Sequence, residues 1–170
     1  MKSWKPYALI LMTIVTFGCS GPSKAELAKI QSSRHEMAEA LVNAYRGNNE
    51  KLFTKLVLPY DELKTFMNAQ VLPPGADVTQ KLEAKKAEFE EKVLATFRTV
   101  MESEALQSGE VAVDGIDILN AVPMGGDYKV EMLQLGIEAA KKSFTQSVTL
   151  ITTPDGRFWF ADIFPLVEKE

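Results

Sequence analysis

Cysteine and histidine are almost missing from this chain of 170 residues, which has one of each. A lone cysteine forms no internal disulfide, and one cysteine with one histidine does not supply the ligands of a zinc site. The sequence also contains no Gly-x-Ser-x-Gly motif and no glycine-rich phosphate loop. We therefore expect no metal and no cofactor.

Long hydrophobic runs are also missing, apart from residues 6–17. This run follows Lys2 and Lys5 and is shorter than the roughly 20 apolar residues that cross a bilayer. A charged start, a short apolar stretch and a small residue before the cut are typical of a secretory signal. We predict a signal peptide over residues 1–18.

Gly18 and Cys19, at the end of this stretch, resemble the processing site of bacterial lipoproteins. The resemblance implies that Cys19 receives diacylglycerol and a fatty acid such as palmitate and becomes the new N-terminus. In such lipoproteins Ser20, in place of Asp, implies an outer-membrane location facing the periplasm. An ordinary signal peptide cut elsewhere, or an uncleaved anchor, is the alternative.

The chain has fewer basic than acidic residues. The chain has 19 Lys and Arg against 23 Asp and Glu, and Lys2 and Lys5 belong to the leader. Residues 19–170 therefore hold 17 basic against 23 acidic residues, a net charge of −6. Such a surface repels phosphate backbones, so we do not expect nucleic acid as a partner.

The rest of the chain predicts a short tether and one domain. Residues 19–22 form the tether, and residues 23–170 suit a single domain. Ser23 and Glu26 form a capping-box pattern that begins a helix. The patterns predict helices over residues 23–46, 50–58, 60–71 and 77–104.

After the helices the pattern changes to that of strands. We expect strands over residues 111–122, 128–137, 144–153 and 157–164, with a bulge near Gly115. The segment 128–137 is also compatible with a helix. Helices followed by hairpin-linked strands predict an α+β fold, an antiparallel sheet with helices packed on one face.

The element order and the closing hairpin over residues 148–163 resemble the NTF2-like, or cystatin-like, domains of small bacterial lipoproteins. The resemblance implies N-terminal helices on one face of a curved antiparallel sheet of about four strands. Because this type of fold carries many functions, the resemblance does not choose among them.

Asp162 is the candidate for acid–base chemistry. Strand alternation places it on one face with Phe160 and Phe164. If that face lined a hollow, burial would raise the pKa of the carboxyl toward that of a general acid or base. The NTF2-like resemblance implies a tyrosine beside it, and Tyr45 and Tyr128 are the candidates. The alternative is an Asp near solvent, paired with a basic residue.

Arg34 is unusual because it falls within the apolar stripe of the first predicted helix. The favoured interpretation is that its stem lies along apolar neighbours while its charge stays in water. The other interpretation is that the guanidinium is partly buried and pairs with a carboxylate or an acidic ligand. His35, off the stripe, is expected to face water.

The last predicted strand is apolar on both faces. Phe158 and Phe160 point one way, and Trp159, Ala161 and Ile163 point the other. Either the strand is central and covered on both sides, or one face meets a partner. The resemblance implies dimerisation through this face. We expect Trp159, with its two neighbours, to contact a second copy or an envelope protein.

Together these features predict a membrane-anchored periplasmic lipoprotein that acts as a non-catalytic binding or protein-interaction module of the cell envelope. The alternative is a small acid–base enzyme of the NTF2-like type that uses a cavity carboxylate.

Overall fold

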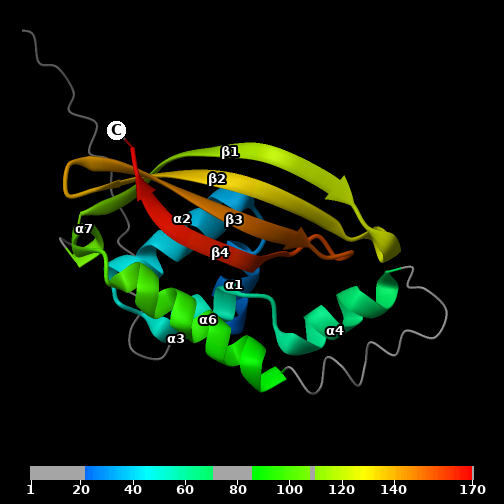
Figure 1. Ribbon diagram of the computed structural model, residues 1–170. Helices are drawn as coiled ribbons and strands as arrows, with labels where there is room; N and C mark the ends of the chain where they lie inside the picture. Colours follow the sequence, from blue (N-terminus) through cyan, green and yellow to red (C-terminus); the bar gives the residue numbers. More distant parts are fainter. Residues whose placement is uncertain (1–21, 71–85, 108–109, 170) are drawn as a thin grey trace, which may run out of the picture.

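The computed structural model describes residues 22–70, 86–107 and 110–169. Six described helices precede an antiparallel sheet of four strands, which confirms the predicted α+β class (Figure 1). The helices are α1 (Lys24–Ile30), α2 (Arg34–Arg46), α3 (Glu50–Leu56), α4 (Tyr60–Ala69), α6 (Lys86–Met101) and α7 (Glu104–Gln107). The strands are β1 (Val111–Pro123), β2 (Lys129–Ala139), β3 (Lys142–Thr152) and β4 (Phe158–Glu168).

The predicted first helix is interrupted. The capping box of Ser23 and Glu26 is present, but α1 ends at Ile30 and α2 begins at Arg34. Serine hydroxyls stabilise the break: Ser32 donates to the Lys29 carbonyl, and the Ser33 side chain accepts from the Glu36 N–H. Because such hydroxyls compete with the helical ladder, two serines in sequence favour a new helix start here.

The second half of the helical region matches the prediction in part. α3 and α4 lie where helices were expected. α6 occupies the C-terminal part of the predicted helix 77–104, whereas α7 begins at Glu104, where that helix was expected to end. The predicted helix start at Asp77 lies outside the described residues.

The sheet has the strand order β1-β2-β3-β4, with every neighbouring pair antiparallel. The ambiguous segment is a strand, since β2 covers residues 129–139 and pairs on both sides. The bulge expected near Gly115 is present as a register shift between Val113 and Gly115.

Three further register shifts were not foreseen, and the one at Ala161 of β4 bears on the predicted site. Leu150 pairs with Phe160, but the preceding Thr149 pairs with Asp162, so Ala161 is the extra residue. The extra residue reverses the alternation beyond it. Ile163 consequently packs in the same core cluster as Phe160, and the predicted shared face of Phe160 and Asp162 is wrong.

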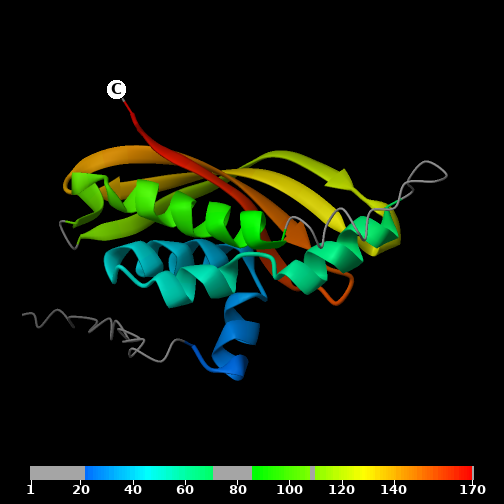
Figure 2. The same cartoon turned by 60° about the horizontal axis from the view of Figure 1, so that its bottom comes forward.

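Two apolar clusters lie on opposite faces of the sheet. The larger one joins one face to α2, α3 and α6, which Figure 2 shows layered on one side of the sheet. The smaller one contains Ile151 and Trp159, which are paired across β3 and β4, and Phe66 of α4. Helices therefore cover one face broadly, and α4 covers the other face only at one end.

The two edges of the sheet differ. At the β4 edge, the Phe158 N–H donates to the Gln31 carbonyl at 2.9 Å, and the Leu58 N–H donates to the Phe160 carbonyl at 2.8 Å. Residues 57 and 58 thus add a short parallel bridge outside β4. The other edge is β1, where most residues after Ile116 are exposed.

Candidate functional site

One recess is a groove of about 520 Å³ beside the β4 edge. α6 forms one wall, and α1 and the α3–α4 connection form the others. Apolar side chains dominate the lining: Leu27, Val57, Leu58, Pro59, Phe89, Val93, Leu94 and Trp159. A volume within roughly 300–1,000 Å³ and a largely apolar wall are the usual properties of a small-ligand site.

Local sequence explains why this space is open. Residues 57 and 58 leave helix α3 to bond with β4, and Pro59 then begins α4 in a new direction. On α6, Phe89 and Val93 are one turn apart and therefore share a face. The diverging helices and the face of α6 enclose the groove between them.

Trp159 contributes to the groove wall while it belongs to the smaller cluster. Its side chain is 5% exposed, and the Arg157 guanidinium lies 5.7 Å from the ring centroid. The indole Nε1 is buried and meets no acceptor among the described residues. An unmet buried donor costs about 1–3 kcal/mol, so this tryptophan carries a local cost in stability.

Charged side chains line the rim. Lys86 and Glu90 face each other at 4.0 Å, and the Lys86 ammonium lies 5.4 Å from the Tyr60 ring centroid. Lys55 donates to the Pro22 carbonyl at 3.0 Å. Neither Lys55 nor Asp61 has an oppositely charged partner within the described part of the chain. The rim therefore offers one uncompensated positive charge and one uncompensated negative charge.

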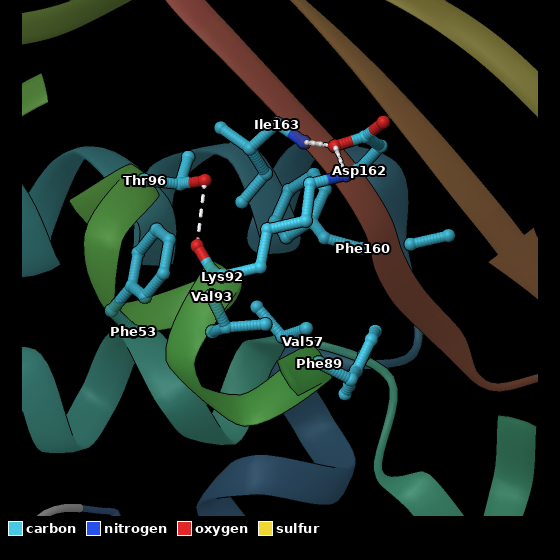
Figure 3. A pocket seen from close by; sticks show the side chains of 10 residues that line it. Phe53, Val57, Phe89, Lys92, Val93, Thr96, Phe160, Asp162 and Ile163 are labelled. Atoms are coloured by element: carbon cyan, nitrogen blue, oxygen red, sulfur yellow. Dashed lines mark hydrogen bonds and ion pairs between the residues drawn. The ribbon is translucent and has the colours of Figure 1, made fainter. Parts of the chain in front are cut away.

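A smaller pocket of about 30 Å³ adjoins the groove, and Val57, Phe89 and Val93 line both (Figure 3). It has room for no more than a water molecule or two. Lys92 of α6 extends across it toward the Asp162 carboxylate, which lies 3.8 Å from the ammonium.

Asp162 is therefore an ion-paired residue at the sheet edge. Its side chain is 40% exposed, and its Oδ1 also accepts from the Ile163 N–H at 3.1 Å. This matches the alternative of an Asp near solvent paired with Arg157 or a lysine, because the partner is Lys92.

The two candidate tyrosines lie in different clusters. Tyr45 is fully buried in the larger cluster, where its hydroxyl contacts the Gln146 amide at 3.1–3.2 Å, and burial raises its pKa. Tyr128 packs edge-on against Phe66 in the smaller cluster, and burial also raises its pKa. The structure therefore does not bring Asp162, Tyr45 and Tyr128 into one site.

Arg34 forms the ion pair that was the less favoured interpretation. Its Nε and one terminal nitrogen each donate to Glu131 at 2.7 Å, and its guanidinium lies 5.0 Å from the Phe158 ring centroid. Lys129 adds a second cation at 2.6 Å. The Arg34 hydrogen bonds outweigh the effect of burial and hold the pKa of Glu131 below its ordinary value.

The predicted contact residues of the last strand are internal. Phe158, Trp159 and Phe160 are buried. The expectation that Trp159 is an exposed contact residue is therefore wrong. α4 covers the sheet face on which Trp159 lies. The last strand is therefore covered there on both faces, but it is an edge strand and not a central strand. Exposed apolar residues do occur elsewhere on this sheet face, at Met132, Phe164 and Val167.

These three residues belong to what we call the outer-face patch, a shallow recess of about 610 Å³ across β2, β3 and β4. Its other members are Gln134, Thr145, Ser147 and Pro165. Phe164 follows the bulge at Ala161, and unbroken alternation assigns it to the opposite face, which is why the sequence did not indicate the patch. Val167 lies on the face that unbroken alternation gives it, because a further register shift follows between Gln146 and Val148.

The groove and Glu131 were also missed. A glutamate within the strand sequence Lys129–Ile137 was the available signal for a buried charge, because its neighbours at alternate positions are apolar. The groove had no local signal, since its walls come from segments far apart in sequence. Cys19 lies outside the described residues.

Comparison with protein-family models, with curated proteins and with solved structures gave no match for this chain. Within the described residues, no group of three or more His, Cys, Asp or Glu side chains is arranged to hold a metal ion. None of the described helices has the length and hydropathy to cross a membrane.

Proposed function

We propose that this protein is a periplasmic lipoprotein, anchored through Cys19, that acts as a non-catalytic binding module of the cell envelope. The groove beside Trp159 is its ligand site. The observation that carries this proposal is the groove itself, about 520 Å³ in volume and lined mainly by apolar side chains. The outer membrane, facing the periplasm, is the proposed location, as Ser20 implies.

The anchor is tested by the variant Cys19→Ser. We expect the protein to move from the membrane fraction to the soluble periplasm, because the acyl chains that hold it are gone. An unchanged distribution would show that Cys19 is not the anchor.

The ligand site is tested with the dye N-phenyl-1-naphthylamine, whose fluorescence rises in apolar surroundings. Leu94 lines the groove and lies outside both apolar clusters, so Leu94→Glu places a charge in the groove with little effect on folding. We expect this variant to lose dye binding. The matched control is Ala95→Glu, at the next and exposed position of α6, which should bind as the parent does.

A second candidate function is protein contact through the outer-face patch. Met132, Phe164 and Val167 are 44%, 41% and 62% exposed, and no described helix covers them. Large exposed apolar groups on one sheet face favour association. We propose a second copy of this chain as the partner, and an envelope protein as the other occupant to be tested.

Sedimentation of the parent and of Phe164→Glu tests this second candidate. We expect a dimer that the variant converts to monomer, with unchanged circular dichroism. A monomeric parent protein would exclude the second copy, and capture of an envelope protein that Phe164→Glu abolishes would then identify the other occupant.

A further inference from the structure

The described chain begins at the rim of the groove. Pro22, the first described residue, is buried, and its carbonyl accepts a hydrogen bond from Lys55, which lines the groove. Leu27, in the first turns of α1, lines the groove as well. The entry of the chain into the fold and the opening of the groove are therefore on the same part of the molecule.

The distance from this rim to Cys19 is limited by the chain itself. Three residue steps separate Cys19 from Pro22, and a fully extended chain covers at most about 11 Å in three steps. This inference rests on the proposed function: if Cys19 is lipidated, Pro22 is within that distance of the lipidated residue at the bilayer surface. The groove then opens close to the membrane.

The groove lining matches part of a membrane lipid. Apolar walls suit a hydrocarbon chain, and the volume suits one small ligand. At the rim, Lys55 and Asp61 carry charges of opposite sign, and neither has an oppositely charged partner among residues 22–70, 86–107 and 110–169. Such a pair is complementary to a headgroup that holds both a phosphate and an amine.

We propose that the groove binds a zwitterionic phospholipid with a single acyl chain, taken from the bilayer in which the protein is anchored. The acyl chain lies along Phe89, Val93 and Leu94, with Trp159 at the wall. The phosphate is directed to Lys55 and the amine to Asp61.

The test uses the intact lipoprotein in its own membranes, labelled by light with lysophosphatidylethanolamine that carries a diazirine in its chain. We expect labelled peptides from α6 and from the segment around Trp159. Leu94→Glu should reduce labelling at least about tenfold, because it places a charge among the apolar walls. Ala95→Glu should label as the parent does.

The headgroup is tested by Lys55→Glu and by a diazirine fatty acid with the same chain. We expect the phospholipid probe to label Lys55→Glu several-fold less than it labels the parent. We also expect the fatty acid to label the parent several-fold less than the phospholipid does. Equal labelling by the fatty acid, or labelling that Leu94→Glu leaves unchanged, would overturn the inference.

The dye experiment separates this inference from the proposed function. If the dye binds in a Leu94-dependent way and the phospholipid probe does not label the groove, the lipid inference is wrong and the ligand site stands. If neither binds, both are wrong. Circular dichroism of each variant checks that the fold is retained.

Discussion

Arg34 and Glu131 form a two-point ion pair, with two N–O distances of 2.7 Å, that joins the first turn of α2 to the middle of the sheet. The Glu131 side chain is completely buried, whereas that of Arg34 is 33% exposed. A buried carboxylate is tolerated only when it is paired and hydrogen bonded. The pair therefore holds the first turn of α2 against β2.

We expect Glu131→Gln to lower the free energy of unfolding by about 3 kcal/mol, because it removes the anion from two cations in a buried setting. The folded-state pKa of Glu131 is below its ordinary value. Its contribution to stability is therefore present above the ordinary carboxyl pKa and is lost as the pH falls through the lowered one. Urea unfolding at several pH values measures both effects, and Glu131→Gln should flatten the acid limb. A variant as stable as the parent at neutral pH would contradict this.

Trp159 and Phe164 belong to the same strand but should respond differently to truncation. Trp159→Ala empties part of the smaller cluster, and we expect a loss of about 3–5 kcal/mol. Phe164→Ala removes a side chain that is 41% exposed, and we expect a change within about 1 kcal/mol for the isolated protein. Urea unfolding of the two variants measures this, and equal losses would show that the burial assigned to Trp159 is wrong.

The Tyr45 hydroxyl stabilises the core through its hydrogen bond to Gln146. Tyr45→Phe leaves the Gln146 carbonyl oxygen without its hydrogen bond in a buried setting, and we expect a loss of about 1–2 kcal/mol. The Gln146 amide nitrogen keeps its bond to the Phe164 carbonyl at 2.8 Å. In a Gln146→Leu background the cost of Tyr45→Phe should fall, because the partner is gone. Thermal unfolding of the four proteins of this cycle gives the coupling, and a cost that does not change would indicate another origin.

Ser33 maintains the start of α2. Its side chain accepts the Glu36 N–H at 3.1 Å, so Ser33→Ala should cost about 1 kcal/mol of stability. Ser33→Asp preserves an acceptor at the cap and should be close to neutral. Chemical unfolding of both variants is the measurement, and a neutral Ser33→Ala would mean that packing alone fixes the start of this helix.

The sequence by itself determined the elements that depend on local chemistry. The capping box at Ser23, the bulge near Gly115, three of the four strands and the α+β class follow from hydrogen bonding and apolar periodicity within short segments. The segment 128–137 was left open between strand and helix, and its pairing on both sides in the sheet decided it. The break between α1 and α2 was missed although Ser32 and Ser33 indicated it, because the apolar stripe runs across it and outweighed the caps in the prediction.

Only the tertiary structure decided the site. The β4 bulge reversed the faces beyond Phe160, which moved Asp162 out of the expected hollow and placed Phe164 on the outer face. Arg34 pairs with Glu131, which lies 97 positions further along the chain. Likewise, the groove arises where α1, the α3–α4 connection, α6 and Trp159 come together. Alternation and periodicity describe neighbours along the chain, and such contacts depend on how distant segments pack.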